Sequence, residues 1–170
     1  SSDVCSSDLN YGCSFCTIPL ARGRSRSAKP EEVLSNLKEL IKKGSKEIVL
    51  SGINIGDYGI IEGKRSNDFY TLLQKINNEI KNIRLRISSI EPNLLSNEII
   101  KLISESEIFV NHFHIPLQSG SNKILNSMSR RYTSELYEDR VKYVKKLMPD
   151  ACVGGDVIVG FPGEDKNEFD

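Results

Sequence analysis

Apolar residues recur three or four positions apart in several stretches, which is the period of an amphipathic helix. The stretches cover residues 30–43, 68–80, 133–148 and, more briefly, 96–104. Pro30 suits the first turn of a helix, and Gly44 suits the stop that follows it. Asp68 and Thr133 are residue types that cap helix N-termini. Four helices are therefore predicted.

Short apolar or β-branched runs lie between these helices. They cover residues 47–50, 83–90, 109–117 and 152–159, and a fifth strand before Pro30 also fits the pattern. Strands that alternate with helices indicate βαβ units and a parallel sheet. Residues 157–159 are uniformly apolar, which predicts a strand covered on both faces. The fold class is α/β, and periodicity alone leaves a doubly wound sheet and a (β/α) barrel both open.

Polar and glycine-rich segments follow each predicted strand. They are residues 51–54, 91–92, 116–121 and 160–164. In parallel α/β proteins this edge of the sheet is where active sites are built. Each segment alone could be only a turn, since the same residue types dominate turns. Four such segments in succession favour a shared ligand site.

Composition narrows the class of protein. The chain has 170 residues, enough for one domain, and a formal net charge of zero, so any RNA contact must come from local patches. No apolar run approaches the roughly 18 residues of a membrane helix, and no membrane association is expected. The four cysteines are few and unevenly spaced, which argues against a disulfide framework and for a reducing, cytoplasmic setting. Cys152 is expected to pack within its strand.

Cys13 and Cys16 form a C-x2-C pair in a loop before the first long helix. Two thiolates at this spacing can hold one metal ion or two irons of a cluster. Alone, the pair is compatible with half a zinc site, a redox dithiol or part of an iron–sulfur site. Zinc would need two further ligands, and no second pair has zinc-finger spacing. The redox alternative lacks a thioredoxin-like strand before the pair.

Residues 10–19 strongly resemble the cluster loop of the radical S-adenosylmethionine methylthiotransferases, which carry C-x3-C-x2-C with an aromatic before the last cysteine. In that family three thiolates bind a 4Fe–4S cluster, and its fourth iron binds S-adenosylmethionine. The resemblance implies that Cys13 and Cys16 are cluster ligands and that Phe15 lies near the adenine. The family's first cysteine falls at Leu9, which cannot ligate iron.

Residues 1–9 repeat Ser-Ser-Asp and show no periodicity, and residues 3–9 resemble a translated sequencing adapter. We predict that they are a non-native leader, that the native sequence starts at Asn10, and that the parent protein has a cysteine at position 9. The alternative is a native N-terminal segment. Residues 10–170 are then expected to be an incomplete radical barrel domain without the family's N-terminal cluster domain and C-terminal RNA-binding domain. An open sheet edge and poor solubility would follow.

The resemblance continues in the family's order through the rest of the chain. It covers residues 20–27, 48–56, 86–92, 114–121, 130–133 and 156–164. It implies a partial (β/α) barrel of the radical S-adenosylmethionine type, truncated here. It also implies a pocket for S-adenosylmethionine built with Gly52, Asn54, Gln118, Ser119 and Gly160, although each glycine could equally serve a turn. No side chain is expected to act as a general acid or base.

Residues 88–92 resemble the family branch that acts on N6-threonylcarbamoyladenosine beside the tRNA anticodon. That branch implies methylthiolation of C2 of the adenine through a 5′-deoxyadenosyl radical. The implied partners are the tRNA anticodon stem-loop, S-adenosylmethionine and an electron donor such as a flavodoxin, with a second 4Fe–4S cluster in the missing N-terminal domain. The alternatives are isopentenyladenosine in tRNA, a ribosomal protein, an inactive fragment without a complete cluster, and a zinc-dependent RNA-binding module.

Other polar residues are harder to assign. Arg22, Arg24 and Arg26 could contact a cofactor carboxylate or RNA phosphate, or form a solvated loop. Arg130 is expected to be solvated. His112 and His114 share one face of a strand, which could line the barrel, and the expectation is that they are satisfied core groups.

Overall fold

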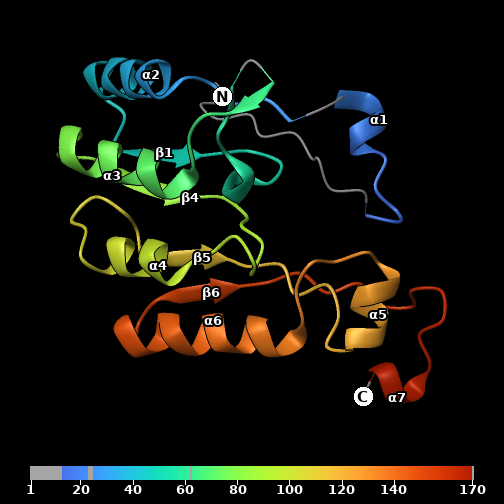
Figure 1. Cartoon of the computed structure of the whole chain (residues 1–170). Helices are drawn as coiled ribbons and strands as arrows, with labels where there is room; N and C mark the ends of the chain where they lie inside the picture. Colours follow the sequence, from blue (N-terminus) through green and yellow to red (C-terminus); the bar gives the residue numbers. More distant parts are fainter. Residues whose placement is uncertain (1–12, 23–24, 62, 170) are drawn as a thin grey trace.

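The computed structural model describes residues 13–22, 25–61 and 63–169. Its four parallel strands are β1 (Glu47–Leu50), β4 (Arg84–Ile87), β5 (His112–His114) and β6 (Cys152–Gly154). β1 pairs with β4, β5 pairs with β6, and a parallel bridge between Leu85 and Phe109 joins the two pairs. Figure 1 shows the strands stacked in chain order with their arrowheads pointing the same way. An order without reversal is that of a (β/α) barrel rather than a doubly wound sheet, and the described strands cover only part of a barrel.

The main helices form a layer in the same order as the strands. They are α2 (Pro30–Lys42), α3 (Phe69–Glu79), α4 (Asn97–Ser104) and α6 (Ser134–Leu147), and each packs on the next. Leu37, Leu72, Leu85 and Ile100 are fully buried between the helices and the strands. Burial alternates along β1, because one face of the sheet meets the helices and the other is open.

The predicted helix ends are confirmed. Pro30 is the first residue of α2, and Gly44 follows its end with φ of +92°. The Asp68 carboxylate accepts the Thr71 N–H at 2.8 Å at the start of α3. The Thr133 hydroxyl accepts the Leu136 N–H at 3.4 Å at the start of α6. Polar caps and a glycine stop therefore set these boundaries locally.

Several short elements were not predicted, because they are too short to show a period. They are α1 (Ile18–Arg22), η1 (Ile55–Asp57), the hairpin β2 (Ile60–Ile61) and β3 (Lys64–Arg65), and α5 (Asn122–Ser127). The sequence does suggest that a helix begins near Glu168, where the structure has α7 (Lys166–Phe169). In Figure 1, α1, α5 and α7 lie beyond the arrowheads of the strands. They therefore surround the edge of the sheet at which polar segments were predicted to meet.

The prediction of a covered strand at residues 157–159 is wrong. β6 ends at Gly154, and only a bridge between Gln118 and Val157 continues the pairing. Val157 and Val159 are 60% and 64% exposed, because β6 has only β5 as a neighbour among the described strands. Cys152, expected to be packed, is exposed for the same reason. Described residues 25–29 form no strand.

Among the described residues, no helix has both the length and the apolar character needed to cross a membrane. The predicted leader, including Leu9 and Cys5, lies outside the described residues.

Candidate functional site

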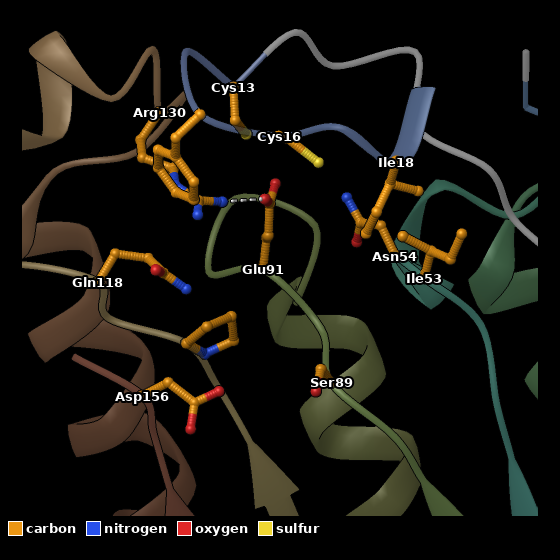
Figure 2. Close-up of a pocket in the computed structure, with 12 residues that line it drawn as sticks. Cys13, Cys16, Ile18, Ile53, Asn54, Ser89, Glu91, Gln118, Arg130 and Asp156 are labelled. Carbon is orange, nitrogen blue, oxygen red and sulfur yellow. Dashed lines mark hydrogen bonds and ion pairs between the residues drawn. The ribbon is translucent and has the colours of Figure 1, made fainter. Parts of the chain in front are cut away.

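A cavity of about 270 Å³ opens at the carboxyl ends of the parallel strands. Figure 2 shows its lining side chains, which come from the cysteine loop, from the segments after β1, β4, β5 and β6, and from Arg130 after α5. Polar segments that are far apart in the sequence therefore meet in one place, as the parallel arrangement predicts.

The cysteine loop is tied to α5. The Ser14 N–H donates to the Met128 carbonyl at 3.3 Å, and the Ser14 hydroxyl donates to the Ser127 carbonyl at 3.0 Å. The Cys16 N–H donates to the Cys13 carbonyl at 3.1 Å, which closes a turn between the two cysteines. Both cysteines line the cavity, and Figure 2 shows them at one edge of it.

Burial raises the pKa of the Cys13 thiol, and the charge of Arg130 opposes this rise. Without a metal ion the thiol therefore favours its neutral form. Thiolate is the form that binds metals, so binding would release the proton. The nearby guanidinium also suits a site that is to hold negatively charged sulfur.

Arg130 is at the centre of the site, contrary to the expectation that it is solvated. Its Nη1 lies 3.0 Å from Oε1 of Glu91, and the two side chains are only 9% and 10% exposed. Its guanidinium also lies 5.5 Å from the centroid of the Phe15 ring. Phe15 in turn meets Phe161 edge to face, with 6.0 Å between centroids. The Arg130 guanidinium therefore contacts the cysteine loop through Phe15 and the segment after β4 through Glu91.

Glu91 is a buried carboxyl. Burial raises its pKa, although the charge of Arg130 and its hydrogen bond to Glu91 act in the opposite direction. Asn54 itself is buried and lines the same cavity from the segment after β1. Glu91 therefore stands at the junction of three segments of the site.

Gln118 is held in an unusual backbone conformation, with φ of +68°. Its N–H donates to the Asp156 carbonyl and its carbonyl accepts the Ile158 N–H, both at 2.8 Å. These bonds fix the segment after β5 against the segment after β6, and the Gln118 side chain lines the cavity. A glutamine in the left-handed region is uncommon, and such positions are often found at functional sites.

Ser89 and Asp156 also line the cavity, and His114 connects them. The Ser89 hydroxyl is hydrogen bonded to Nδ1 of His114, and Nε2 of His114 lies 3.2 Å from Oδ2 of Asp156. His112 and His114 flank the buried Phe113 on β5, so they do share one face of the strand. His114, however, is half-buried beside the cavity rather than in the core.

The structure brings five of the eight predicted site residues together: Cys13, Phe15, Cys16, Asn54 and Gln118 all line the cavity. Gly52 and Ser119 do not line it, and the buried Ser119 hydroxyl accepts the Ser121 N–H at 3.1 Å within a turn. Gly160 lines an adjoining hollow beyond Phe15, together with Phe161. Whether these residues bind a cofactor stays a prediction.

Sequence reasoning missed Ser89, Glu91 and Asp156 as lining residues. Glu91 lies in one of the polar segments that were predicted to come together at the sheet edge. Ser89 and Asp156 lie in segments that resemble the family. The signal that could have found them is therefore a polar residue just after a strand. Of the three arginines after the cysteine loop, Arg26 is exposed and outside the cavity lining.

The two cysteines fit part of a cluster site. C-x2-C spacing suits two irons, and both thiols line one cavity beside a cation. In residues 13–22, 25–61 and 63–169, no group of three Cys, His, Asp or Glu side chains could hold a metal ion. The described residues therefore supply two ligands, and neither histidine completes a zinc site with them.

Residues 6–170 match the sequence pattern of a known family, described as the radical SAM superfamily, where SAM is S-adenosylmethionine. The chain is 47% identical over 161 residues to the threonylcarbamoyladenosine tRNA methylthiotransferase MtaB of Bacillus subtilis. It is 41% identical over 162 residues to the tRNA-2-methylthio-N(6)-dimethylallyladenosine synthase of Clostridium perfringens. Each match covers 94% of this chain but only 35% and 36% of the relative, so the chain spans about a third of their length.

Solved structures share the fold at low sequence identity. The radical SAM methyltransferase TsrM of Kitasatospora setae aligns with a TM-score of 0.66 at 16% identity, over 90% of this chain and 29% of that one. The cobalamin-dependent radical SAM enzyme OxsB aligns with a TM-score of 0.68 at 14% identity, over 92% of this chain and 23% of that one. These likenesses support the partial barrel.

Proposed function

The chain belongs to the radical SAM superfamily, and from this premise we propose that its cavity is the cofactor site of a tRNA methylthiotransferase. One observation carries the proposal. The C-x2-C thiols, Phe15 and the buried Arg130–Glu91 pair converge at the carboxyl ends of parallel strands. Relatives that are 47% and 41% identical over 94% of the chain carry methylthiotransferase or methylthio-synthase names, which supports the reaction class.

The proposed reaction is methylthiolation of C2 of N6-threonylcarbamoyladenosine next to the tRNA anticodon. The higher identity to the threonylcarbamoyladenosine enzyme, 47% against 41%, supports this substrate. The second candidate is N6-dimethylallyladenosine, which the name of the other relative favours. The substrate tRNA, a second 4Fe–4S cluster and a flavodoxin-like electron donor belong to the proposal for the parent protein, together with a cytoplasmic location.

In this proposal Cys13 and Cys16 would hold two irons of a 4Fe–4S cluster. When bound, the cluster and SAM supply the one-electron chemistry that activates a C–H bond of the substrate. Phe15 would pack against SAM, and the side-chain amides of Asn54 and Gln118 would hydrogen bond to it.

The Arg130–Glu91 pair would fix the position of the loop and keep a positive charge beside the thiolates. The protein's contribution is therefore position, charge and exclusion of water.

Anaerobic reconstitution with iron and sulfide tests this function. We expect the Leu9→Cys variant to take up about four irons per chain and to release 5′-deoxyadenosine from SAM. The chain with Leu9 should do neither. Leu9→Ser controls for loss of the leucine, and Leu20→Cys adds a thiol at a position on α1 that is 89% exposed. Both controls should behave like the chain with Leu9.

The outcomes separate the alternatives. A folded Leu9→Cys variant that gains no iron over the controls contradicts the ligand assignment. Activity of the chain with Leu9 would equally contradict it, because leucine cannot supply the third ligand. Stoichiometric zinc in a colourless protein would support the zinc-binding alternative instead.

A further inference from the structure

Three side chains form a hydrogen-bonded chain at the end of the cavity away from the cysteines. Ser89 follows β4, His114 ends β5 and Asp156 follows β6, so each comes from a different strand. The Ser89 hydroxyl bonds to Nδ1 of His114, whose Nε2 lies 3.2 Å from Oδ2 of Asp156. Figure 2 shows Ser89 and Asp156 opposite the edge that carries Cys13 and Cys16.

The partners assign the direction of these hydrogen bonds. An ionised carboxylate can only accept, so Nε2 of His114 carries the hydrogen that Asp156 accepts. In a neutral imidazole Nδ1 is then an acceptor, and the Ser89 hydroxyl donates to it. The remaining lone pairs of Ser89 and Asp156 are then free to accept hydrogen bonds from a ligand in the cavity.

The surroundings hold the imidazole in place. A Cβ on Gly154 of β6 would lie 3.7 Å from Cδ2 of His114, so the strand backbone lies close beside the ring. The His114 side chain is 30% exposed, whereas Asp156 is 66% exposed and reaches the open part of the site. One fixed ring therefore sets the positions of two acceptors that line the cavity.

We propose that Ser89 and Asp156 accept hydrogen bonds from the N–H and hydroxyl donors of the substrate adenine nucleoside, and that His114 is the positioning residue for both. This inference rests on the proposed function, which assigns the cysteine end of the cavity to the cofactor. The substrate must then approach from the opposite end, where these two acceptors lie. The adenosine part of SAM carries similar donors, so the experiment has to distinguish the two sources.

Imidazole ¹⁵N NMR of the chain without a cluster tests the proposal. The chain has two histidines, and His112→Gln assigns their signals. We expect His114 to carry hydrogen on Nε2, the ring nitrogen that faces Asp156. Titration with the free nucleoside N6-threonylcarbamoyladenosine should shift the His114 signals and leave those of His112 unchanged.

Variants then measure the contribution of each group. Asp156→Asn and His114→Gln should weaken nucleoside binding about tenfold or more. The first removes the charged acceptor, and the second removes the ring that holds this acceptor in position. Asp156→Asn should also redistribute hydrogen between the two ring nitrogens of His114, which a purely structural role would not cause. His112→Gln, on the same strand face, should bind the nucleoside normally.

Two results would overturn the proposal. If SAM alone shifts the His114 signals and displaces the nucleoside, this end of the cavity belongs to the cofactor. If the nucleoside leaves His114 unchanged, or if folded Ser89→Ala and Asp156→Asn variants bind it as tightly as the original chain, the assignment is wrong. Iron uptake and SAM cleavage by Leu9→Cys are measured without the nucleoside, so failure of the proposed function is seen separately.

Discussion

At the scale of single residues, the surroundings of a carboxyl group decide whether its pKa is raised or lowered. Glu91 lies in the segment after β4 and is buried, so its pKa is raised even though Arg130 pairs with it. Glu47 lies on the open face of β1, where hydrogen bonds from Arg86 and Arg84 lower its pKa. The buried pair is therefore weak evidence for stability and is better explained by the site that it organises.

The two carboxyls should give opposite pH dependences of the free energy of unfolding. A raised folded pKa means that the stability from Glu91 is full below its ordinary value and is lost as the pH rises through the raised value. A lowered folded pKa means that the stability from Glu47 is present above its ordinary value and is lost as the pH falls through the lowered value.

Urea unfolding between about pH 3 and 8 measures this difference. Glu91→Gln should remove part of the decrease in stability that accompanies rising pH above about 4. Glu47→Gln should instead remove part of the loss on the acid side. Identical pH slopes in Glu91→Gln and the original chain would show that the Glu91 pKa is not raised.

At the scale of elements, the segments after the strands position the site. The segment after β6 passes so close to the segment after β5 that a side chain is excluded at Gly155. A Cβ there would lie 2.8 Å from the Ile115 carbonyl oxygen and 3.0 Å from the Tyr137 hydroxyl. The backbone could avoid these contacts only by shifting, which would also move Asp156.

Gly155→Ala should therefore lower the free energy of unfolding by about 1–3 kcal/mol, as expected for overpacking. Gly120→Ala is the matched control, because a Cβ there meets nothing within 4 Å and its φ is not positive. Its effect should stay within about 0.5 kcal/mol. Denaturant unfolding of both variants measures the difference, and equal stabilities would contradict the close approach.

At the scale of the whole molecule, β6 is an edge strand with only β5 beside it among the described strands. Val157 and Val159 are more than half exposed beside the end of β6, and Phe169 in α7 is 61% exposed. Exposed apolar surface next to an incompletely paired strand favours association between molecules.

The Val157→Lys, Val159→Lys double variant should therefore associate less than the original chain. Light scattering across a range of protein concentrations measures this effect. Leu20→Lys replaces an even more exposed apolar residue on α1, away from the end of β6, and should change association little. If the two variants reduce association equally, the charge itself rather than the open edge is responsible.

The sequence by itself determined the order of the four main helices and the four parallel strands, the caps of these helices and the pair Cys13–Cys16. These features depend on spacing along the chain: a helix repeats every 3.6 residues, a cap acts within three residues, and the thiols are three apart. The short helices α1 and α5 carry too few residues for a period, so they appear only in the structure.

Only the tertiary structure decided which polar groups meet. Arg130 reaches Glu91 across 39 positions, and His114 links Ser89 to Asp156 across strand ends that are far apart in the sequence. The left-handed backbone at Gln118 helps to turn the segment after β5, whereas the neighbouring Ser119 is buried in a turn. The direction of a side chain after a strand depends on such backbone angles and on packing between segments, neither of which is set by residue spacing.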